Sequence, residues 1–192
     1  MEKVLYEEML PHEIVARRRK FPAAFVGLGG LEWHGEHMAV GNDALKAEKL
    51  CELAAARSGG FAFPTLWYGE PRVAGLMESG YDQDGAIKKR MAFKDENFND
   101  TKVFAGIEFH YPPETEDVGG DHAAKWETSY LWYLRPDCVD LSVYLGRDDE
   151  KLVGIMGDDP RRTATVEIGR KACDLIVEGM VRKANDLIQR AK

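Results

Sequence analysis

The chain has 192 residues, 44% of them hydrophobic and 31% charged, which is enough apolar chain to bury one core. We therefore expect a single domain over residues 1–192. The formal net charge of −7 argues against a nucleic-acid binder, which would carry a basic face. The three cysteines are widely spaced and no apolar run could span a membrane, so we expect a cytoplasmic protein with reduced thiols and no membrane partner.

The first third of the chain predicts a helix and then a strand–helix–strand unit. The expected ranges are a helix at 11–20, a strand at 23–28, a helix at about 43–57 and a strand at 61–65. The first strand is a continuous apolar run, typical of a buried strand in a parallel sheet. Asn42 is a suitable N-cap for the second helix, and Gly59 and Gly60 are suited to end it.

The rest of the chain contains further elements around a segment that is harder to interpret. Residues 67–100 are rich in glycine, proline and charge, with one short helical candidate at 85–91. A third strand is expected at 101–109, followed by an acidic loop at 111–120. A helix then opens at Asp121 or His122 and runs to Leu134, where Arg135-Pro136 stops it. A long amphipathic helix runs from Pro160 to the C-terminus.

Three potential metal ligands follow the first strand within twelve residues. Glu32 and His34 are two apart, so in an extended segment their side chains point the same way. Asp43, at the start of the next helix, can direct a carboxylate into the same cleft, where α/β sheets place their chemistry. Any one of these residues alone would be read as a surface or structural residue. Together they suit one or two divalent ions, Zn, Mn or Fe, which would activate a water and polarise a carbonyl.

A second pair, His122 and Glu127, lies far away in sequence. Five residues on a regular helix turn through about 140°, so both cannot point at one ion from mid-helix. We therefore expect His122 in the loop before the helix, free to act as a proton shuttle, and Glu127 on the helix face that lines the cleft. The alternative for Glu127 is that it caps the helix or forms a salt bridge.

The two clusters resemble the motifs of the creatininase (creatinine amidohydrolase) family. That family's first motif, Glu-x-His-Gly-x-His followed by Gly-x-Asp, stands here from Glu32 to Asp43, and residues 120–129 with 135–136 are similar to its later motif. The resemblance implies an α/β three-layer fold with a mostly parallel central sheet flanked by helices. It implies metal ligation by Glu32, His34, Asp43 and Glu127, a catalytic His122, and hydrolysis of a C–N bond in a cyclic or linear amide.

One feature departs from the family pattern. The family has a strand ending in a Gly-His motif, whose histidine is a metal ligand, and no Gly-His pair occurs in this chain. The match between this chain and the family pattern is interrupted near residues 97–102. Either a segment is missing from the sequence or the gene carries a true deletion; loss of an interior strand would leave unpaired backbone groups, which favours the first explanation. The second would favour a rival function, a non-catalytic binding or assembly protein that keeps the fold.

The resemblance also implies a homohexamer. Tyr130, Trp132 and Tyr133 lie on the helix that carries Glu127 and could pack against a neighbouring subunit, although aromatic residues at helical spacing also commonly pack into a core. We expect the loops at 67–82 and 110–119 to determine which substrate the protein accepts. The sequence does not identify the substrate or the residues that bind it.

Overall fold

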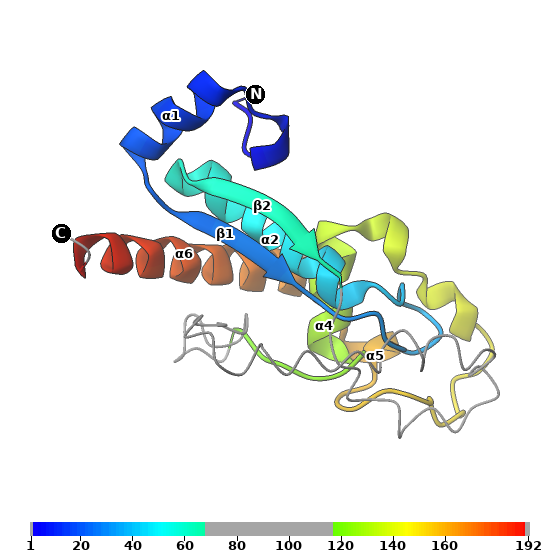
Figure 1. The fold of residues 1–192 in the computed structure, drawn as a ribbon. Coiled ribbons are helices and arrows are strands. Elements are labelled where there is room, and N and C mark those ends of the chain that lie inside the picture. Colours follow the sequence, from blue (N-terminus) through cyan, green and yellow to red (C-terminus); the bar gives the residue numbers. More distant parts are fainter. Residues whose placement is uncertain (1, 68–116, 191–192) are drawn as a thin grey trace, which may run out of the picture.

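The computed structural model describes residues 2–67 and 117–190 of the chain. Two parallel strands lie over long helices, with a short helical segment at the N-terminal end (Figure 1). The elements in chain order are η1 (Tyr6–Glu8), α1 (Pro11–Lys20), β1 (Ala24–Leu28), α2 (Asn42–Ser58), β2 (Phe61–Leu66), α4 (Lys125–Leu134), η4 (Pro136–Cys138), η5 (Leu141–Tyr144), α5 (Pro160–Thr163) and α6 (Val166–Arg190).

The predicted strand–helix–strand unit is present, with β1 and β2 paired in parallel. Its helix begins one residue earlier than expected: Gly41 is the N-cap of α2, so the assignment of that role to Asn42 is wrong. Asn42 is instead buried in the first turn, where its side-chain amide donates to Asp43 Oδ1 over 3.1 Å. Gly59, with φ of 87°, ends the helix as predicted.

The first strand is less buried than its apolar run suggested. Phe25 packs in the core, whereas Val26 and Leu28 remain 50% and 40% exposed. Side chains alternate between the two faces of a strand, and α2 contacts the strands from the face that carries Phe25. The sheet has two strands within the described residues; the strand expected at 101–109 and the helix at 85–91 lie outside them.

Two glycines allow elements to approach closely. A Cβ on Gly29, just after β1, would overlap the backbone of Asp43 and Ala44 at the start of α2. A Cβ on Gly169 would overlap the carbonyl of Ser129, where α6 crosses α4. The first approach brings the start of α2 against the end of β1, and the second draws α4 onto the core helix α6.

The main core lies between α2, α4, α6 and the strands. Its largest fully buried members include Tyr130, Ile176 and Val177. The Tyr130 hydroxyl donates to the carbonyl of Gly119 over 2.5 Å. The ring is therefore buried and its hydroxyl has a hydrogen-bond partner within the chain. Of the two places left open for Tyr130, the core and a subunit interface, the structure shows the core.

Two expected helix starts are corrected by capping interactions. The helix expected from 121 or 122 begins at Lys125, because the carboxylate of Asp121 lies outside the helix and accepts the backbone N–H groups of Trp126 and Glu127. The long helix expected from Pro160 is divided into α5 and α6. Ala164 and Thr165 separate them, and the hydroxyl of Thr165 accepts the N–H of Ile168 at the start of α6.

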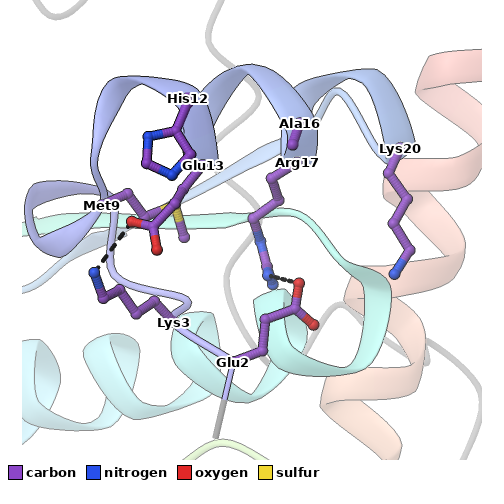
Figure 2. Close-up of a pocket in the computed structure, with 8 residues that line it drawn as sticks. All are labelled: Glu2, Lys3, Met9, His12, Glu13, Ala16, Arg17 and Lys20. Atoms are coloured by element: carbon purple, nitrogen blue, oxygen red, sulfur yellow. Dashed lines mark hydrogen bonds and ion pairs between the residues drawn. The ribbon is translucent and has the colours of Figure 1, made fainter.

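The N-terminal segment is fastened to the strand–helix–strand unit by Arg17. This side chain is 6% exposed, and its guanidinium donates to the carbonyls of Gly60 and Ala55 over 2.5 and 3.0 Å. Figure 2 shows Arg17 paired with Glu2 in a pocket of about 320 Å³ beside α1. No helix within the described residues is long and apolar enough to cross a membrane.

Candidate metal centre

Five side chains with metal-binding atoms meet near the carboxyl end of β1. Glu32 and His34 come from the loop after β1, Asp43 from the first turn of α2, His122 from the loop before α4, and Glu127 from the first turn of α4. We call this set the carboxylate–histidine cluster. All five residues singled out in the sequence are therefore brought together, and His122 lies in a loop as expected.

His34 is the central residue of the cluster, and its side chain is fully buried. Its Nδ1 lies 3.2 Å from the backbone carbonyl of Glu32. A carbonyl can only accept, so Nδ1 carries the proton in the neutral ring and the lone pair is left on Nε2. That Nε2 atom lies 3.3 Å from Glu127 Oε2, 3.4 Å from Asp43 Oδ1 and 3.9 Å from Glu32 Oε1.

His122 is oriented in the same manner. Its Nε2 lies 2.8 Å from the backbone carbonyl of Trp33, which places the proton on Nε2. Its Nδ1 then faces the cluster, 3.9 Å from both Glu32 Oε1 and Glu127 Oε2. The turn that holds it is tight, since Ala123 has φ of +52°.

Glu127 is held at both carboxylate oxygens. Oε2 accepts the N–H of Ala123 over 2.9 Å, and Oε1 accepts the ammonium of Lys46 over 2.8 Å. The salt-bridge alternative considered for this residue is thus also realised, alongside its place in the cluster. The carboxylate is ordered before any ligand arrives.

Lys46 is the residue of the site that the sequence interpretation missed. It lies three residues after Asp43 on α2, and its side chain is only 3% exposed. Residues three apart on a helix share a face, so the predicted helix already placed this lysine beside Asp43. Its contact with Glu127, 81 residues away, requires the folded structure.

The donor atoms fit a divalent metal ion. Ligand atoms stand about 2.0–2.2 Å from zinc, which puts neighbouring ligand atoms about 3.0–3.5 Å apart. The separations from His34 Nε2 to Glu127 and Asp43 lie in this range. This buried nitrogen makes no hydrogen bond to any described residue, although it faces three carboxylates. Both imidazoles also donate their other N–H to a carbonyl, an arrangement typical of metal-ligating histidines.

The pKa values of the ionisable groups also indicate that the site favours a positive charge. Burial acts to lower the pKa of His34, but the neighbouring carboxylates of Asp43 and Glu127 raise it to about 10. Burial acts to raise the pKa of Glu127, but Lys46 and His34 bring it well below its usual range. Burial, with the charge of His34, lowers the pKa of His122. A proton on His34 thus occupies the place that a metal ion would take.

A second histidine of the loop, His37, has a structural environment. It is 2% exposed, with Nε2 2.8 Å from the hydroxyl of Thr128 and Nδ1 3.2 Å from the hydroxyl of Tyr144. Burial, followed by the charge of His34, lowers its pKa to about 4. His37 therefore links the loop that carries His34 to α4 and η5.

Comparisons with known proteins show similarity to one family in sequence and in fold. The family model "Creatininase: Creatinine amidohydrolase" matches residues 7–78. No curated protein matches the sequence. Among solved structures, "Creatininase Mn" is 18% identical with a TM-score of 0.62, over 96% of this chain and 98% of that chain. A mutant creatininase complexed with creatine is 20% identical with a TM-score of 0.60, over 96% and 98%.

A third structure extends the comparison to a named organism. The putative creatinine amidohydrolase from Bacteroides fragilis NCTC 9343 is 16% identical with a TM-score of 0.55, over 98% of both chains. Identities at this level show a shared fold. The chain thus resembles the creatininase family in sequence over residues 7–78 and has the creatininase-like α/β fold, as its motifs predicted.

Proposed function

We propose that the protein is a metal-dependent amidohydrolase that cleaves a C–N bond of a cyclic or linear amide. The observation that carries the proposal is the carboxylate–histidine cluster, in which two imidazoles turn their lone pairs toward three carboxylates. Structures of the same fold include a "Creatininase Mn" and a mutant creatininase of the Zn-Zn type, which supports a divalent ion here. The creatine complex of a further mutant creatininase supports a small-molecule substrate.

In this proposal Glu32, His34, Asp43 and Glu127 hold one or two divalent ions, which we expect to be Zn, Mn or Fe(II). A divalent ion supplies Lewis acidity toward the amide carbonyl and toward the attacking water. His34 and Glu127 are buried, so bulk water would be kept from their side of the site, which would strengthen that effect.

His122 is the proposed proton carrier. Its lowered pKa keeps the imidazole neutral near pH 7, with Nε2–H fixed by the Trp33 carbonyl and Nδ1 open toward the cluster. Nδ1 accepts a proton from water as its oxygen attacks the carbonyl carbon. It then returns the proton to the amide nitrogen as the C–N bond breaks, giving a carboxylic acid and an amine.

The experiment compares the wild-type chain with His122→Gln after reconstitution with Zn²⁺ or Mn²⁺. Amine or ammonia release is measured across a panel of cyclic and linear amides. We expect hydrolysis that chelation abolishes and metal restores, and a loss of at least about a hundredfold in His122→Gln with metal content unchanged. His12→Gln, which changes an exposed histidine of α1, is the matched control and should keep full activity.

The rival function, a non-catalytic binding or assembly protein, depends on residues 97–103, which lie outside the described part of the chain. The same panel separates the two. Metal bound at the cluster with no hydrolysis of any amide would favour the rival.

We also propose that the protein is cytoplasmic and forms a closed homohexamer. With Tyr130 buried, Trp132 and Tyr133, which are both partly exposed on α4, could contribute to an interface. Light scattering should return a mass of several chains, and a mass near 21.6 kDa at micromolar concentration would contradict the assembly.

A further inference from the structure

The cluster contains two overlapping sets of candidate ligands rather than one. Glu32, His34 and His122 form the first, and His34, Asp43 and Glu127 form the second. Both sets use His34, and the lone pair of its Nε2 can bind only one ion. The described residues therefore offer a complete set of three ligands to one ion at a time.

Lys46 lies against the second set. Its Nζ is 2.8 Å from Glu127 Oε1 and 4.0 Å from Asp43 Oδ1, and its side chain is almost fully buried. A buried ammonium this close to two carboxylates acts as a fixed positive charge at one side of the cluster. Oε1 of Glu127 accepts the ammonium of Lys46, and Oε2, which accepts the N–H of Ala123 and lies 3.3 Å from His34 Nε2, is the oxygen that faces an ion.

The charges of the described residues select the number of ions. The three carboxylates of Glu32, Asp43 and Glu127 carry three negative charges, and Lys46 balances one of them. One divalent ion would balance the charges of these four described residues, of which Lys46 and Glu127 are buried. A second would give these four described residues an excess of two positive charges beside the buried ammonium of Lys46, and excess charge is costly where side chains are shielded from water.

We infer that the ammonium of Lys46 takes the place of a second cation, so that the site holds one divalent ion per chain. This inference rests on the proposed metal-dependent function and assigns a positioning role to Lys46. The lysine holds Glu127 as a ligand through one oxygen and prevents that carboxylate from bridging two ions. Nothing in the role requires Lys46 to touch the substrate.

The test is the number of ions bound, measured on the full-length wild-type chain, Lys46→Met and Lys49→Met. Lys46→Met keeps most of the side-chain volume and removes the charge. Lys49→Met removes a lysine one turn further along α2, which pairs with Glu52 near the surface, and is the matched control. Each protein is titrated with Mn²⁺ by calorimetry, and bound metal is counted by elemental analysis. Electron paramagnetic resonance then reports whether two Mn²⁺ ions are coupled in one site.

We expect one Mn²⁺ per chain in the wild type and in Lys49→Met, with no coupled signal, and up to two per chain with a coupled signal in Lys46→Met. Two ions in the wild type would overturn the inference while leaving the proposed function intact. One ion in all three proteins would also overturn it, since Lys46 would then not be the cause. No ion in the wild type would contradict the metal-dependent function itself. Circular dichroism checks folding, and Lys46→Gln replaces Lys46→Met if that variant is unfolded.

Discussion

Metal ions and protons should compete for one atom in this site, Nε2 of His34. The pKa of His34 in the metal-free chain is about 10, so near pH 7 the nitrogen carries a proton that must leave before an ion can bind. The pKa values of Asp43 and Glu127 are lowered, so both carboxylates are already ionised at that pH. The pKa of His122 is lowered as well, so this ring is already neutral.

The magnitude follows from the distance between the working pH and that pKa. Three pH units below about 10, roughly one molecule in a thousand has a bare Nε2, so the apparent Mn²⁺ affinity at pH 7 is about a thousandfold below its limit. Between about pH 6.5 and 8.5 the affinity should rise about tenfold per pH unit, with about one proton released for each ion bound.

Calorimetry in two buffers of different ionisation enthalpy measures both quantities. His34→Gln should lose most of the affinity and the pH dependence, and His12→Gln, at an exposed histidine far from the cluster, should keep both. A wild-type affinity that does not change over this pH range, with no proton release, would refute the reasoning.

Three predictions concern the metal-free fold. Protonated His34 contributes its full stabilisation of the metal-free fold below the ordinary histidine pKa of about 6.5, and this contribution is lost as the pH rises through about 10. The urea concentration at the midpoint of unfolding should therefore fall at alkaline pH unless metal is present. His37 is buried neutral with a pKa of about 4, so its contribution is full above about pH 6.5 and declines by up to about 3 kcal/mol as the pH falls to 4; His37→Gln should show a smaller acid loss. Arg17→Met removes charged hydrogen bonds to the Gly60 and Ala55 carbonyls and should cost about 2–4 kcal/mol in urea unfolding, against less than about 0.5 for the exposed Lys20→Met. An Arg17→Met loss equal to that of Lys20→Met would contradict the role of Arg17 in joining the N-terminal segment to the strand–helix–strand unit.

Local sequence patterns predicted both strands and the longer helices of the described residues, and all five residues of the cluster. The alternation of an extended segment placed Glu32 and His34 on one side, and the angular spacing of a helix placed His122 in the loop before α4. These are short-range consequences of backbone geometry, so a sequence is sufficient to find them. The order of the first strand–helix–strand unit followed from the same kind of pattern.

Features that depend on tertiary contacts were either not predicted or left open between alternatives. The pairing of Lys46 with Glu127 joins residues 81 apart, and the burial of Tyr130 depends on packing against α6. The break between α5 and α6 depends on Thr165, which caps α6 while its N–H donates to the hydroxyl of Ser129 on α4. In each case a partner from a distant segment decides the outcome.

The most direct test of the account is the location of a bound ion. Crystals grown with Mn²⁺ or Zn²⁺ and measured at the absorption edge of the metal place the ion by its anomalous signal. The account predicts a single peak within about 2.5 Å of His34 Nε2 and of carboxylate oxygens of Asp43 and Glu127, with Lys46 still bound to Glu127. A peak elsewhere on the chain, or none at saturating metal, would contradict the assignment of the carboxylate–histidine cluster as a metal centre.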